Sequence, residues 1–97
     1  MAITTVIAAT ESASAGAATE FTTTGPFVLY GDHFGWDESA QLLRLGPSGQ
    51  YLPATNREGV IQVGSQPNMV LVDVPGSYRL DKVATAAAAS VGYEEVL

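Results

Sequence analysis

The sequence contains no cysteine, so disulfide bonds, thiolate metal sites and cysteine nucleophiles are excluded. Its 97 residues make one domain, and a domain of this size buries roughly 60–70% of the surface that its unfolded chain exposes. That burial suffices for a single core but not for a core together with a large enclosed pocket. Small domains without such cross-links often depend on self-association or on docking to a larger structure.

Basic residues are scarce: Arg44, Arg57, Arg79 and Lys82 stand against ten acidic residues, and the formal net charge is −6. A net negative domain repels the phosphate backbone, so we expect no nucleic-acid partner. Residues 1–10 lack the basic start and the apolar centre of a secretory signal peptide. No run of about 18 apolar residues is present, so we expect no membrane partner.

Short apolar or alternating segments, separated by turns rich in glycine and proline, dominate the chain after residue 20. The expected strands are 26–31, 40–45, 50–55, 59–64, 69–74, 77–83 and 91–97. The turn "GPSG" makes 40–55 a hairpin, in which Pro53 suggests an edge strand or a bulge. Segment 84–90 is too short for a stable helix and is interpreted as a connection. This spacing predicts an all-β fold, a single antiparallel β-sandwich of immunoglobulin-like or jelly-roll-like type.

The first 19 residues, rich in Ala, Thr and Ser, are set apart from the predicted sandwich domain at 20–97. Two interpretations remain open for them. One is a strand near 2–9 followed by a linker at 12–19, and the other is an extended N-terminal arm that orders on a partner. The large aliphatic residues Ile3, Val6 and Ile7 are the candidate partner contacts of this segment.

The loop "DHFGWDES" at 32–39 is the richest polar cluster of the chain. Asp32, His33, Asp37 and Glu38 are of the residue types that bind hard metals, but their spacing fits no calcium-loop pattern, so we predict no metal site. His33 is the only histidine, and nothing in the sequence supplies a nucleophile elbow or an oxyanion hole beside it. We therefore predict no catalytic residues and no cofactor.

The same loop carries two aromatic residues, Phe34 and Trp36. They either fold back onto the sandwich or face a partner, because aromatic side chains on loops are typical anchors of protein interfaces. We take both as candidate partner contacts.

The stretch "VPGSYRLDKV" at 74–83 joins a Pro-Gly turn to a strand. Gly76 and Tyr78 have the Gly-x-Tyr spacing that introduces a late strand in immunoglobulin-like sandwiches, where the tyrosine hydroxyl ties a corner to the backbone. Leu80 stands where those domains carry a cysteine. We predict a structural corner at Gly76 and Tyr78 and no reactive site.

Three features together resemble small capsid decoration, or cement, proteins of tailed bacteriophages. They are the Ala/Thr-rich start, the hairpin "LLRLGPSGQYLPAT" and the "PGSYRL" corner with its short final strand. The resemblance implies a non-catalytic virion protein, made in the host cytoplasm, that binds the major capsid protein at the capsid surface and stabilises the shell. It also implies self-association as a dimer or trimer, and an N-terminal arm that could add a strand to a neighbour's sheet.

Two alternatives remain. One is a component of the phage tail, neck or fibre, which the same three sequence features allow. The other is a carbohydrate-binding adhesion module, in which Trp36, Tyr30 and Tyr51 would form a stacking platform. An enzyme is the class with the least support.

Overall fold

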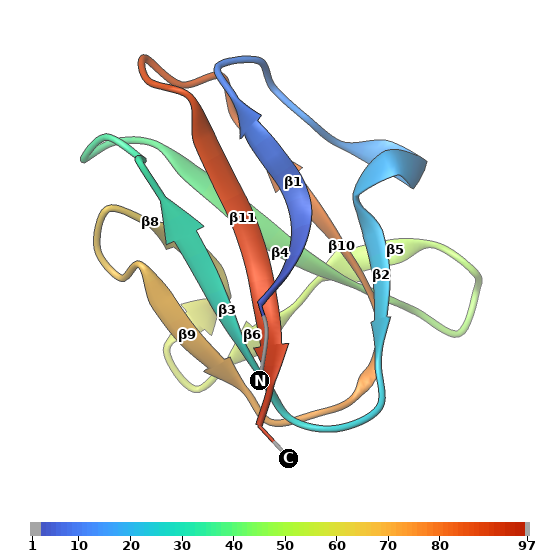
Figure 1. Ribbon diagram of the computed structural model, residues 1–97. Coiled ribbons are helices and arrows are strands. Elements are labelled where there is room, and N and C mark those ends of the chain that lie inside the picture. The colour runs from blue at the N-terminus through green and yellow to red at the C-terminus, as the bar shows by residue number, and fades with distance from the viewer. Residues whose placement is uncertain (1–2, 97) are drawn as a thin grey trace.

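Two antiparallel β-sheets pack against each other in the computed structural model, which describes residues 3–96 (Figure 1). Sheet A contains, in spatial order, β1 (Thr4–Thr10), β11 (Ala89–Glu95), β3 (Phe27–Asp32) and β9 (Met69–Val72). Sheet B contains β2 (Glu20–Thr23), β10 (Gly76–Lys82), β4 (Ser39–Leu45) and β5 (Tyr51–Pro53), and β8 (Gln62–Gly64) also pairs with β4. The remaining elements are a short hairpin of β6 (Thr55–Asn56) and β7 (Gly59–Val60), and the 3-10 helix η1 (Gly16–Thr19). The predicted all-β antiparallel sandwich is confirmed.

The strands pair in a regular order along the chain. Strand β1 pairs with β11, β2 with β10, β3 with β9 and β4 with β8. Strands of the first half of the chain thus pair with strands of the second half in reverse order. The members of this series alternate between the two sheets, which is the arrangement of a jelly roll. In an immunoglobulin-like sandwich the last two strands share one sheet, whereas β10 and β11 lie in different sheets here. Of the two predicted variants, the strand order is therefore that of the jelly roll.

Alternate residues of the strands fill the space between the sheets, as the two-residue period of a β-strand requires. Phe27 and Leu29 from sheet A meet Leu42, Tyr78 and Leu80 from sheet B, and none of these side chains is more than 1% exposed. The rings of Phe27 and Tyr78 pack edge to face, with their centroids 5.2 Å apart. Burying a side chain of this kind stabilises a fold by roughly 2 kcal/mol, so this layer is a main source of stability.

Most of the expected strands lie where the alternating pattern placed them. Strand β3 occupies 27–32 where 26–31 was expected, β10 covers most of 77–83, and β4 and β5 form the hairpin around 46–49, with Pro53 on the edge strand of sheet B. The expected strand at 59–64 is divided between β7 and β8, because Ile61 hydrogen-bonds instead to the backbone of Ala54 and Leu42. Among residues 3–96 the four-residue η1 is the only helix, and none is long and apolar enough to cross a membrane.

Residues 4–10 belong to sheet A. Strand β1 pairs with β11 from Thr4↔Tyr93 to Thr10↔Ala89, with two register shifts between these ends. This agrees with the strand interpretation of 2–9, of which Ala2 lies outside the described residues. The extended-arm interpretation is corrected for residues 4–10, because their ladder of hydrogen bonds is made within the same chain.

The buried Lys82 fastens the following linker to the sandwich. Its ammonium group donates to the carbonyl oxygens of Ser12 and Val83, at 2.9 and 3.1 Å, and to Thr85 Oγ1 at 3.2 Å. Ser14 and Lys82 also exchange two backbone hydrogen bonds. The N-terminal segment is therefore held to the sandwich by side-chain and backbone bonds.

Candidate interaction site

The loop between β3 and β4, residues 33–38, is fixed by its own carboxylate. Glu38 accepts hydrogen bonds from the backbone N–H of Gly35 at 2.6 Å and of Ala86 at 2.9 Å. These bonds, chiefly that from Gly35, hold the pKa of the Glu38 carboxyl below its ordinary value. His33 adopts a positive φ of 66°, which turns the chain sharply at the end of β3. These hydrogen bonds therefore fix the backbone from which the side chains of the loop project.

The two aromatic residues of this loop have opposite environments. Phe34 is 8% exposed and packs in the core, where its ring lies over Gly31. Trp36 is 89% exposed, and it is the only tryptophan of the chain. Phe34 thus anchors the loop, and of the two predicted contacts only Trp36 offers its side chain to a partner.

Trp36 borders a small hollow of about 190 Å³ between the loop and the turn that follows β8. Its other lining residues are mostly polar and include Asp37, Gln62, Ser65 and Gln66. The indole face therefore lies beside amide, hydroxyl and carboxylate groups. Such a combination suits an interface with both stacking and hydrogen bonding.

The acidic and histidine groups of the loop do not gather around one point. Asp32 Oδ2 lies 3.4 Å from His33 Nδ1, and both side chains are exposed. Within residues 3–96 no group of three or more Asp, Glu, His or Cys side chains is arranged to hold a metal ion.

The predicted N-terminal contacts lie in three environments. Ile7 is a core residue, and Val6 is half-buried against that core. Ile3 is exposed and lines a separate hollow with Tyr30 and Gly92 on the outer face of sheet A. The structure therefore does not bring these three residues and Trp36 into one surface.

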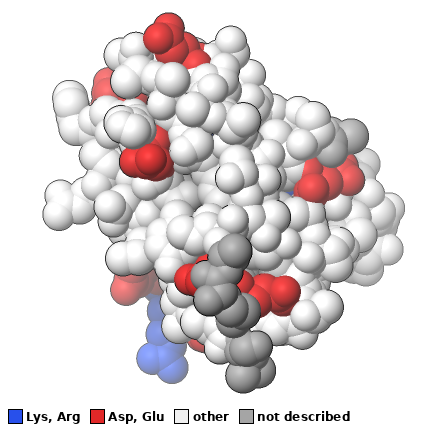
Figure 2. All heavy atoms as spheres, in the orientation of Figure 1, with Lys and Arg blue, Asp and Glu red and all other residues white. Residues whose placement is uncertain are grey.

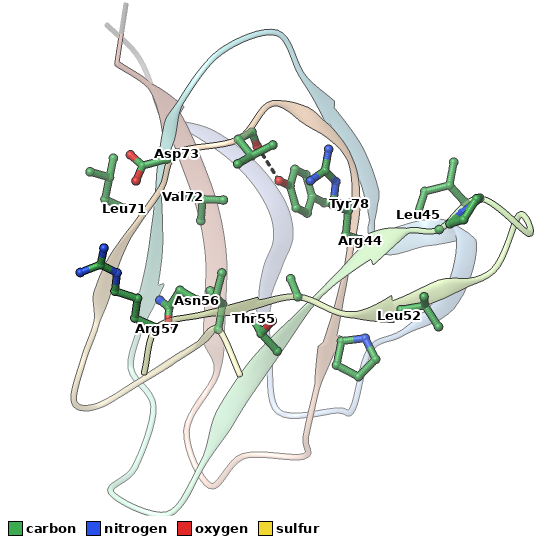
Figure 3. Close-up of a pocket in the computed structure, with 16 residues that line it drawn as sticks. Arg44, Leu45, Leu52, Thr55, Asn56, Arg57, Leu71, Val72, Asp73 and Tyr78 are labelled. Carbon is green, nitrogen blue, oxygen red and sulfur yellow. Dashed lines mark hydrogen bonds between the residues drawn. The ribbon is translucent and has the colours of Figure 1, made fainter. Parts of the chain in front are cut away.

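An open groove of about 700 Å³ lies between the β9 side of sheet A and the β5 side of sheet B (Figure 3). The buried Tyr78 and Val72 lie at its base, and exposed apolar side chains stand around it. These exposed residues are Leu45, Leu52, Leu71 and Val74. A jelly roll is open on the side where its edge strands do not pair, and the groove occupies that opening.

The predicted corner lies at one end of this groove. The Tyr78 hydroxyl donates to the carbonyl oxygen of Val74, across the turn that leads into β10 (Figure 3). A Cβ on Gly76, whose φ is 155°, would lie 3.3 Å from Arg44 Nη2, so this position favours glycine. Burial raises the pKa of Tyr78 above its ordinary value, and the nearby Arg44 partly opposes this. Gly76 and Tyr78 thus occupy the corner at which the Gly-x-Tyr spacing placed them.

Two of the four basic side chains, Arg44 and Arg57, also line the groove. Arg44 donates to the carbonyl oxygen of Pro75 at 3.2 Å, and its guanidinium lies 5.9 Å from the centre of the Tyr78 ring. Neither Arg57 nor the neighbouring Asp73 makes an ion pair within the described chain. Lys and Arg are nearly absent from the visible face over sheet A (Figure 2). The groove therefore combines exposed apolar side chains with two basic ones.

Sequence reasoning missed the exposed residues of β9, Met69 and Leu71. The segment "MVLVDV" is apolar on both faces, which is typical of a buried strand. In the structure Val72 is buried and Val70 packs against the core, whereas Met69 and Leu71 are more than half exposed. Nothing local in the sequence marks β9 as the edge of its sheet, because that depends on strands elsewhere in the chain.

Comparison with protein-family models, with curated proteins and with solved structures finds no match for this chain. Its function has therefore to be inferred from the residues described above.

Proposed function

We propose that this chain is a non-catalytic structural protein that binds the outer surface of a phage capsid and stabilises the shell. The observation that carries the docking role is Trp36, a lone tryptophan that is 89% exposed on a loop held by Glu38. Tryptophan is the residue most enriched at the energetic centres of protein interfaces. A loop whose backbone is held in place before binding also loses less conformational freedom when it docks.

The fold is compatible with this role. A jelly roll is one of the architectures found in viral capsid domains and in lectins, and this analogy supports a surface-binding role without specifying a partner. The capsid itself enters the proposal through the resemblance of the sequence to decoration proteins. Weak single contacts would suffice, since many copies docked on a repeating lattice reinforce the shell together.

The first experiment is the copy number of the chain in purified particles from its source, by quantitative mass spectrometry against the major shell protein. Many copies in a near-integer ratio to the shell protein are expected for a decoration protein. A few copies would assign the chain to the neck, tail or fibre. Absence from the particles would refute the virion role.

The second experiment tests Trp36 directly. Since the chain has one tryptophan, the emission of the free chain reports the environment of this side chain, and the emission of the particles alone is subtracted from that of the mixture. Binding to particles that lack the protein should shift the emission to shorter wavelength, and Trp36→Ala should weaken binding by at least about tenfold. Val60→Ala, another exposed apolar position, is the matched control and should bind normally. Equal binding by the two variants would remove Trp36 from the interface.

A carbohydrate-binding role is the second candidate, because Trp36 stands beside a polar hollow with amide and hydroxyl groups. The predicted three-residue platform has to be reduced to Trp36, since Tyr30 lies on β3 of sheet A and Tyr51 on β5 of sheet B. A glycan array with wild type and Trp36→Ala would test this role. Binding to a glycan that the variant loses would favour it over a capsid partner.

A further inference from the structure

Strand β9 is an open edge of sheet A. It pairs with β3 on one side, and no other strand within residues 3–96 pairs with it (Figure 1). Gly31 N donates to Asn68 O just before β9, and the residue pairs of an antiparallel ladder alternate between bonded and non-bonded. The even-numbered residues of β9 therefore use their backbone groups on β3. The N–H and C=O groups of Met69 and Leu71 point away from the sheet and are open to another strand.

The other edges of the two sheets carry features that discourage further pairing. Strand β1 has two register shifts, and β2 begins with the charged Glu20. Strand β5 has three residues and ends in Pro53, and β8 also has only three. Strand β9 is short, but its ladder to β3 is unbroken and its four residues include no charge and no proline. It is therefore the edge least protected against pairing.

The outward side chains of β9 extend an apolar strip across sheet A. Met69 is 55% and Leu71 is 54% exposed, and they stand opposite Tyr30 and Val28 of β3. A strip of this kind beside an open edge gives a new strand both backbone partners and an apolar neighbour.

We infer that β9 pairs antiparallel with β9 of a second copy of this chain, about a two-fold axis at Leu71. In this register Leu71 stands opposite Leu71 of the second copy, and Met69 opposite its Asp73. The open backbone groups of all three residues then find partners. An axis at Val70 would instead place Asp73 opposite Pro67, which has no N–H to donate. The inference is independent of the proposed capsid role.

The charges beside the strand allow a second copy to approach. Arg57 and Asp73 line the groove next to β9, so the two-fold arrangement brings one of each from either copy to the seam. The charge there is balanced, whereas each copy as a whole carries −6. Because like net charges repel and one short strand buries less than the roughly 1,200 Å² of a standard interface, we expect a weak dimer that added salt strengthens.

The absence of cysteine allows a direct test of the pairing. Directly opposite residues of a hydrogen-bonded pair have Cα atoms about 5.5 Å apart, which suits a disulfide bond. Leu71→Cys should therefore form a covalent dimer under mild oxidation. Leu52→Cys, at 50% exposure on β5, is the matched control and should remain monomeric. Met69→Cys should cross-link to Asp73→Cys in a mixture of the two variants and only weakly to itself.

Sedimentation velocity of the untagged chain over a range of concentrations gives the second test. Wild type should shift from monomer to dimer as its concentration rises, and Leu71→Lys should weaken the dimer by at least about tenfold while its thermal unfolding stays that of a folded domain. A wild type that stays monomeric throughout, or equal cross-linking by Leu71→Cys and Leu52→Cys, would overturn the inference. Efficient self-cross-linking of Met69→Cys would overturn the Leu71 register. If wild type is monomeric and Leu71→Lys lowers its binding to particles, the edge of β9 pairs with the shell protein and not with a second copy.

Discussion

Replacing Tyr78 by Phe removes one hydroxyl group from the corner and leaves the ring in place. That hydroxyl donates to the carbonyl oxygen of Val74, while the ring is 1% exposed and packs on Phe27 and Phe21. The net value of such a hydrogen bond is about 1 kcal/mol. Val74 is partly exposed, so water can replace the hydroxyl at its carbonyl and the loss stays near that value. For a domain of this size, about 1 kcal/mol lowers Tm by roughly 4–8 °C.

The assay is thermal and urea unfolding followed by circular dichroism. Tyr93→Phe is the matched control, because Tyr93 also stacks on Phe21 but its hydroxyl makes no hydrogen bond in the described chain. Its Tm should equal that of wild type. Tyr78→Ala, which empties the ring site as well, should cost about 3–5 kcal/mol. Equal Tm values for Tyr78→Phe and wild type would refute the role of the hydroxyl at the corner, whatever the effect of Tyr78→Ala.

Three further predictions concern stability and the loop. Lys82→Met keeps most of the side-chain volume but leaves the carbonyls of Ser12 and Val83 without their donor. It should therefore lower the free energy of unfolding, measured by urea titration, by about 2–3 kcal/mol. An unchanged free energy of unfolding would contradict the role of Lys82 in holding the linker to the sandwich. Backbone hydrogen bonds, from Gly35 to Glu38 and from Thr24 to Glu95, lower the pKa values of both carboxyl groups. The two ionised carboxylates therefore contribute fully to stability above the ordinary pKa of 4.5, and this contribution is lost as the pH falls through the lowered pKa values. The Tm of wild type should therefore fall in that acid range more than the Tm of a Glu38→Gln, Glu95→Gln double variant, and parallel curves would argue against the effect. Trp36→Ala should leave Tm unchanged because the indole is almost fully exposed, and a large drop would show that it packs on the domain.

The features that depend on neighbouring residues could be predicted from the sequence. The run "PFVLYG" and the hairpin around "GPSG" became β3, β4 and β5, because turn residues and a two-residue alternation are local properties. The Gly-x-Tyr spacing likewise placed Tyr78 beside a backbone carbonyl only four residues before it.

The features that depend on distant pairing could not be predicted. Whether residues 4–10 form an arm or a strand is decided by β11, at the other end of the described chain. In the loop, Phe34 and Trp36 are two positions apart and similar in type, yet one is buried and the other exposed. The exposure of Leu71 follows from the place of β9 at the end of sheet A. Each of these outcomes is set by which strands become neighbours, which the local pattern does not contain.

The position of β11 between β1 and β3 has a consequence for synthesis on the ribosome. Sheet A has no continuous interior until the strand made last among those described enters its middle, so its first strand must wait unpaired while nearly all of the domain is translated. Closing so long a loop is slow, and a waiting apolar strand is exposed to aggregation. The Ala, Thr and Ser residues of β1 and the linker after it keep that waiting segment mildly polar. The composition of the N-terminal segment thus suits a strand that finds its partner only after the rest of the domain has been made.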